Sequence, residues 1–124
     1  MEDYLQKAKN YYVLGKIAEK IGMLSESATN YFKALAAIND HMLQQIGFKA
    51  KDHTERFHLL RKHYPQLYEV TDKLFLVYRR TYSEEIDKEE LALLCHKLEG
   101  IFKDAKILFP TEREIREKTE KLSK

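Results

Sequence analysis

The longest regular pattern of apolar residues runs from Ser25 to Gly47. Its apolar side chains recur at steps of three and four residues, which is the spacing of one face of an α-helix. Ser25 can cap the start of this helix, and Gly47 can adopt the left-handed conformation that ends one. Because the apolar face is wide, it must be covered on several sides, so we expect this helix at the centre of a bundle. The face consists of Ala28, Tyr31, Phe32, Leu35, Ala36, Ile38, Met42, Leu43 and Ile46.

A second amphipathic pattern precedes it, over residues 2–21. Glycine costs about 1 kcal/mol relative to alanine inside a helix. The position of Gly15 between Ala8 and Ala18 therefore suggests a close approach of two helices. The turn at residues 22–24 is short, so the two helices should form an antiparallel hairpin. The apolar stripe consists of Tyr4, Ala8, Tyr11 or Tyr12, Gly15 and Ala18, with Leu5, Ile17 and Ile21 beside it.

Two further helices are predicted on either side of Pro65. Asp52 is a candidate N-cap for a helix over residues 53–64, which carries Phe57, Leu60 and Tyr64 on one side. Proline is well suited to the first turn of a helix, so Pro65 should begin the next one, over residues 65–82. The two can also be read as one helix with a break at Pro65. The inward side chains of the second are predicted to be Leu67, Tyr68, Val70, Leu74, Phe75, Val77 and Tyr78.

The last part of the chain predicts one more core helix and a charged tail. Asp87 and Glu90 have the spacing of a capping box at the start of a helix over residues 88–108. Phe109–Pro110 should end it, and Thr111 with Glu114 should open a tail that only Ile115 and Leu122 can anchor. We therefore expect an all-α, up-and-down bundle of four to five helices over residues 1–109, followed by a loosely docked helical tail over residues 110–124. The core face of the 88–108 helix is Leu91, Leu94, Cys95, Leu98, Ile101, Phe102 and Ala105.

The composition says more about the size, charge and cellular location of the protein than about a reaction or ligand. The 124 residues suffice for one domain, and 34% are charged with a net charge of only +2. This balance argues against a general nucleic-acid coat protein and permits a local basic patch. A single cysteine, Cys95, cannot form an internal disulfide, which favours a reducing, cytoplasmic location. The N-terminal residues lack the apolar region of a signal peptide, and no run approaches the roughly 20 apolar residues of a membrane span.

The histidines and the cysteine do not predict a metal site or a cofactor. His53, His58 and His63 are five residues apart, and a step of five turns a helical side chain by about 140°. They therefore do not share a face, whereas metal-binding pairs on helices use steps of three or four. Cys95 occupies a core position and is expected to act as a small buried hydrophobic residue.

Two basic segments are candidates for binding phosphate. The first runs from Lys49 to His63, interrupted by Asp52 and Glu55, and it could equally be an exposed solubilising surface. The second, Arg79-Arg80-Thr81-Tyr82, ends an apolar helix, where arginines also interact favourably with the helix dipole. Its more specific interpretation is a phosphate site with Tyr82 as a stacking neighbour. The basic side chains and histidines of the first segment are Lys49, Lys51, His53, Arg56, His58, Arg61, Lys62 and His63.

The order of these segments resembles the HEPN family of small α-helical proteins. The matching pieces are the first helix, SESATNYFKALAAINDHMLQQIG, KDHTERFHLL, the helix ending VYRRTY, and DKEELALLCHKLEGIF. The resemblance covers residues 4–106 and implies a helical bundle that is usually a homodimer. Many family members are ribonucleases, often toxins paired with a minimal nucleotidyltransferase antitoxin, and others are thought to bind nucleotide or RNA without cutting it.

Only half of the ribonuclease signature of that family is present. The signature is Arg-x4–6-His, and Arg79 and Arg80 match its arginine. The positions for the histidine carry Glu84, Glu85, Ile86 and Asp87. A carboxylate there would repel the charge of a phosphodiester substrate. The resemblance therefore implies a module that binds without catalysis.

Three functions follow as hypotheses. The leading one is a non-catalytic, cytoplasmic module that binds a nucleotide, an RNA or a protein partner, with no DNA-specific motif and no membrane association. The second is a metal-independent ribonuclease that recruits His53 or His58 from elsewhere in the fold or the dimer. The third is a structural partner of a nucleotidyltransferase. For the first, we expect the site at Arg79, Arg80 and Tyr82, assisted by Lys49, Lys51, His53 and Arg56. A homodimer is also expected, from the resemblance, the abundant tyrosines and the wide stripe of the first two helices.

Overall fold

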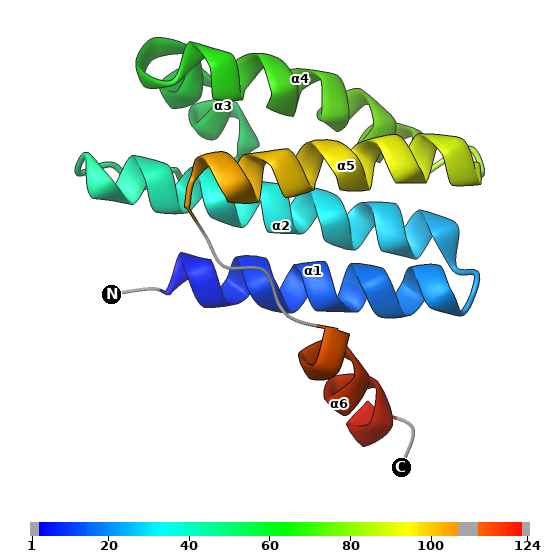
Figure 1. The fold of residues 1–124 in the computed structure, drawn as a ribbon. Coiled ribbons are helices and arrows are strands. Elements are labelled where there is room, and N and C mark those ends of the chain that lie inside the picture. The colour runs from blue at the N-terminus through cyan, green and yellow to red at the C-terminus, as the bar shows by residue number, and fades with distance from the viewer. Residues whose placement is uncertain (1–2, 107–111, 123–124) are drawn as a thin grey trace.

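The computed structural model describes residues 3–106 and 112–122, and within these it is an all-helical bundle (Figure 1). Helices α1, α2, α4 and α5 alternate in direction, and the short α3 lies between α2 and α4. Helix α6 projects from the other side of α1. The all-α bundle predicted from sequence is confirmed. The helices are α1 (Tyr4–Lys20), α2 (Leu24–Gln45), α3 (His53–His63), α4 (Pro65–Arg80), α5 (Lys88–Asp104) and α6 (Glu112–Leu122).

Helix α2 is the centre of the bundle, as its wide apolar face predicts. It packs against α1, α3, α4 and α5. Three positions of the predicted face differ, because Ala36 and Met42 are only half-buried and Ile46 is 42% exposed at the end of the helix. Because helices pack on α2 from several sides, residues outside the predicted apolar face are buried as well. The buried residues of α2 are Ser27, Ala28, Tyr31, Phe32, Ala34, Leu35, Ala37, Ile38, Asn39 and Leu43.

The two ends of α2 show one wrong prediction and one that is confirmed. Ser25 is not the N-cap, since α2 begins at Leu24 after Met23 without a side-chain cap. Gly47 does adopt a left-handed conformation, with φ of 88°. The N–H of Phe48 then donates to the carbonyl of Leu43 at 2.9 Å. This pattern satisfies carbonyls that the end of a helix leaves without partners.

Asp52 and Asp87 are the N-caps of α3 and α5, as predicted from the sequence. Asp52 accepts a hydrogen bond from the N–H of Glu55 at 2.9 Å, and Asp87 accepts one from the N–H of Glu90 at 2.7 Å. The carboxylate of Glu90 does not return to the backbone as in a full capping box. It binds Arg80 instead, which connects the start of α5 to the end of α4.

Gly15 lies where α1 and α2 approach closely, as predicted. A Cβ atom at Gly15 would overlap the ring of Tyr31, and the Oγ of Ser27 donates to the Gly15 carbonyl at 2.7 Å. The sequence leaves open whether Tyr11 or Tyr12 belongs to the apolar stripe of α1. The structure places Tyr12 in the core at 4% exposed, whereas Tyr11 is half-buried. The absence of a side chain at Gly15 lets a large ring pack directly on the backbone of α1.

Helices α3 and α4 are two helices joined at Tyr64. The backbone of Tyr64, with φ of −138° and ψ of 67°, ends α3, and Pro65 is the first residue of α4. Only Leu74 of the predicted inward face of α4 is fully buried, and its other members are half-buried. Thr71 is also buried. The cost of burying its hydroxyl group is offset by a hydrogen bond, because the Nδ2 of Asn39 donates to the Oγ1 of Thr71 at 3.0 Å.

Helix α5 ends at Asp104 rather than near residue 108, and it supplies every predicted core residue except Ala105, which is half-buried just after the end of the helix. Ile86, in the connector before it, is 2% exposed and was missed as a core residue. Ile115 anchors α6, being 2% exposed, whereas the predictions for residues 109–111 and for the side chains of Glu114 and Leu122 lie outside the described residues. None of the described helices has the length and apolar character required to span a membrane.

Candidate functional site

Five rings form a continuous aromatic row between the start of α3 and the end of α4. Here "aromatic row" means His53, Phe32, Phe75, Tyr78 and Tyr82. The Phe32 and Tyr78 rings stack with centroids 4.6 Å apart, and His53 lies 6.0 Å from Phe75. The sharp junction at Tyr64 folds α3 back beside α4, so the row joins the two basic segments that the sequence shows separately.

Tyr82 is the exposed end of the aromatic row. It is 77% exposed, and its ring lies 5.6 Å from the ring of Tyr78. The two hydroxyl groups share a hydrogen bond of 2.8 Å, which, together with burial, raises the pKa of Tyr78 to about 12. Tyr78 is therefore uncharged at neutral pH, and its hydroxyl group bonds to that of Tyr82, whose side chain stays largely exposed.

Arg80 is engaged within the protein. Its guanidinium donates to Glu90 at 2.6 and 3.0 Å and to Glu84 at 3.1 Å. These bonds, first those to Glu90, raise the pKa of Arg80. The side chain connects α4 to α5, and its positive charge is balanced by two carboxylates. Arg79 is exposed and has no ion-pair partner among the described residues.

Arg56 is likewise engaged, at the other end of the row. It forms a two-pronged ion pair with Asp40 of α2, with N···O distances of 2.7 and 2.9 Å. Both side chains are about 15% exposed or less. A third nitrogen of Arg56 lies 2.8 Å from the Nδ1 of His53. Burial and the charge of Arg56 lower the pKa of His53 below 6.5, so the imidazole is neutral at pH 7.

The two lysines of the predicted site lie in the loop before α3. Lys49 and Lys51 are both exposed, and neither has an ion-pair partner among the described residues. The structure thus divides the predicted site residues into two groups. The side chains of Arg56, Arg80 and His53 bond to one another or to carboxylates of the fold, although His53 is exposed. Arg79, Lys49 and Lys51 are exposed without an ion-pair partner among the described residues, and Tyr82 is exposed with its hydroxyl group bonded to Tyr78.

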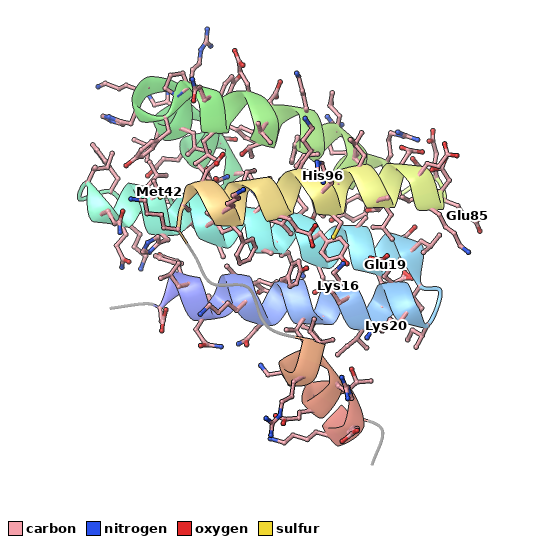
Figure 2. All side chains as sticks on the ribbon, viewed as in Figure 1. Lys16, Glu19, Lys20, Met42, Glu85 and His96 are labelled. Atoms are coloured by element: carbon pink, nitrogen blue, oxygen red, sulfur yellow. The ribbon has the colours of Figure 1, made fainter. Side chains whose placement is uncertain are left out.

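A separate polar cluster lies between α1, α2 and α5, and sequence reasoning missed it. The ammonium of Lys16 lies 5.6 Å from the ring centre of Tyr12 and 5.9 Å from that of Tyr31. Tyr31 donates to Glu19 at 2.6 Å, and Tyr12 donates to Glu99 at 2.8 Å. Lys16 and Glu19 of this cluster are labelled in Figure 2. The partners are up to 87 positions apart, so no local pattern marks them.

Cys95 is a core residue, as expected. It is 6% exposed, and burial raises the pKa of its thiol. The thiolate, which is the reactive form, is therefore disfavoured at neutral pH. Across the described residues, no three His, Cys, Asp or Glu side chains gather as a metal site would require.

The exposed site offers the ring of Tyr82 and, one turn earlier in the chain, the exposed guanidinium of Arg79. Its nearby carboxylates, Glu84 and Glu90, bind Arg80, and the imidazole of His53 is held by Arg56. An exposed ring can stack on a planar group of a ligand, and an exposed guanidinium can contact a negative charge on it. Comparisons of the chain with models of protein families, with curated proteins and with solved structures found no match.

Proposed function

We propose that the chain is a non-catalytic, HEPN-like binding module that holds a nucleotide or a short single-stranded RNA at the exposed end of the aromatic row. The observation that carries this proposal is the ring of Tyr82, which is 77% exposed and hydrogen-bonded to the buried side of the row through Tyr78. A large exposed ring held in place is the usual platform on which unpaired bases stack.

In this proposal the base and the phosphate have separate partners. The base stacks on Tyr82, and Arg79 contacts the phosphate from the preceding turn. Lys49 and Lys51 add positive charge where a longer strand passes the start of α3. Arg56 and Arg80 act indirectly, because their ion pairs hold α3 and α5 against the row. Phosphate contacts of this kind make affinity fall as salt rises.

We expect Tyr82→Ala to weaken the binding of a fluorescently labelled single-stranded RNA by about tenfold, because a stacked base contributes about 1–3 kcal/mol. Arg79→Ala should also weaken binding and should reduce its salt dependence. Fluorescence anisotropy at several salt concentrations measures both effects on the full chain.

Lys73→Ala is the matched control for Arg79→Ala. It removes an exposed positive charge from an earlier turn of the same helix. Its affinity for RNA should be close to that of the wild type. Equal losses in Arg79→Ala and Lys73→Ala, or wild-type affinity in Tyr82→Ala, would contradict the proposed site. Cleavage of the RNA that Arg79→Ala or a His53 variant abolishes would instead favour the ribonuclease alternative.

We also propose that the module forms a homodimer through the outer face of α1. Tyr4, Tyr12 and Tyr31 are core residues, so the abundance of tyrosine no longer supports this idea. Its support is a pair of exposed apolar side chains, Leu14 (42% exposed) on α1 and Ile21 (65% exposed) directly after it, next to the part of α1 on which α6 packs. Apolar side chains that line one helix face mark an interaction surface more often than scattered ones do.

Light scattering at tens of micromolar should therefore give the mass of a dimer, and Leu14→Glu should give a monomer because it buries a charge in the interface. The matched control is Leu93→Glu, another exposed leucine, on α5. It should leave the dimer intact. A wild-type monomer, or the same mass for both variants, would refute this interface.

A further inference from the structure

A pocket of about 550 Å³ lies between the ends of α2, α4 and α5. Its floor is apolar and includes Ile38, Val70 and Ile101, the first of which is fully buried. In Figure 2, Met42 of its lining lies beside the end of α5, whereas Glu85 lies at the opposite end of that helix. The volume is within the range of about 300–1,000 Å³ that small-molecule sites occupy.

The pocket exists because three chain segments turn or end around it. Helix α3 stops at His63, Tyr64 redirects the chain into α4, and α5 ends at Asp104. The hydroxyl of Tyr64 donates to the carbonyl of Met42 at 3.3 Å, which fixes the wall between α2 and α4. The helix ends therefore diverge over an apolar floor that their own side chains do not fill.

The rim of the pocket carries negative charge. Asp104 is the one formally charged side chain among the described residues that line it, and it has no ion-pair partner among them. The C-terminal ends of α3 and α5 meet here, and the negative ends of their helix dipoles add partial negative charge. Helix α4 also begins at the rim, and the N–H groups of its first turn oppose part of this negative charge, although Pro65 contributes none.

We propose that this pocket binds a small hydrophobic amine. Its ring or alkyl body lies against Ile38, Val70 and Ile101, and its ammonium group faces Asp104 at the C-terminal end of α5. The apolar floor of the pocket contacts the hydrophobic body of the ligand, and the carboxylate of Asp104 at the rim favours a positively charged group over a neutral or negative one. This site lies at the start of α4, whereas Tyr82 follows the end of that helix, so the inference goes beyond the proposed RNA-binding function and does not depend on it.

The test compares three molecules that share an indole body: tryptamine, indole-3-ethanol and indole-3-acetate. Each is titrated into the ¹⁵N-labelled full chain and followed by amide chemical shifts. We expect tryptamine to bind most tightly and to shift amides of residues 64–70 and 101–105. Asp104→Asn should weaken tryptamine by about tenfold, because a hydrogen bond to a charged group is lost, and should leave the neutral alcohol unaffected.

Asp72→Asn is the control, since Asp72 is an exposed aspartate of α4 that does not line the pocket. It should bind tryptamine as the wild type does. No shifts with any of the three molecules would overturn the proposal, as would equal affinity for amine and carboxylate or an unchanged affinity in Asp104→Asn. Tyr82→Ala should retain tryptamine binding, so the failure of one proposed site is distinguishable from the failure of the other.

Discussion

Phe32→Ala is expected to lower the free energy of unfolding by about 3–5 kcal/mol. The side chain is 2% exposed at the centre of the bundle, and its ring contacts those of His53, Phe75 and Tyr78. Removing it leaves a cavity between α2, α3 and α4 that these rings can only partly fill. Urea denaturation followed by circular dichroism at 222 nm measures the change.

Leu93→Ala provides the control, because Leu93 is 57% exposed on α5. Its stability should stay within about 0.5 kcal/mol of the wild type. The loss at Phe32 should also reach the site, since Tyr78 loses the ring on which it stacks and holds Tyr82 less firmly. A loss below about 1 kcal/mol for Phe32→Ala would mean that the row is not part of the core.

Gly15→Ala should destabilise the protein by about 1–2 kcal/mol, although alanine is the better helix former by about 1 kcal/mol. The new Cβ would overlap the ring of Tyr31, which is fully buried and cannot swing away. Its hydroxyl is bonded to Glu19 at 2.6 Å, and its other neighbour is the ring of Tyr12, 5.9 Å away. The overlap therefore forces α1 and α2 apart along their contact.

Gly100→Ala is the same substitution without the overlap. Gly100 is an exposed residue of α5, and a Cβ atom there would meet nothing within 4 Å. It should therefore stabilise the protein by about 1 kcal/mol. Melting curves of the two variants should shift in opposite directions. A stabilised Gly15→Ala would show that the two helices are not held at this distance.

Much of the local structure follows from residues within four positions of one another. Asp52 and Asp87 each cap a helix by binding the N–H three residues on, and the left-handed Gly47 ends α2. These features depend on short-range backbone geometry, so a single sequence can predict them. The Ser25 prediction failed because the chain satisfies the start of α2 without any side-chain cap.

The site depended on contacts that no local pattern contains. Both arginines of the pair at positions 79 and 80 looked alike in the sequence, yet Arg80 pairs with Glu90, ten residues away, while Arg79 faces solvent. Arg56 likewise meets Asp40 only because α3 packs on α2.

The sequence alone therefore determined the helices, most of their ends and the central place of α2, since periodicity and capping are local properties. The tertiary structure decided which cations remain free, joined the aromatic row across α2, α3 and α4, and left the pocket at the end of α5. Charge pairing and cavities arise between segments, and their positions depend on how the helices pack against one another.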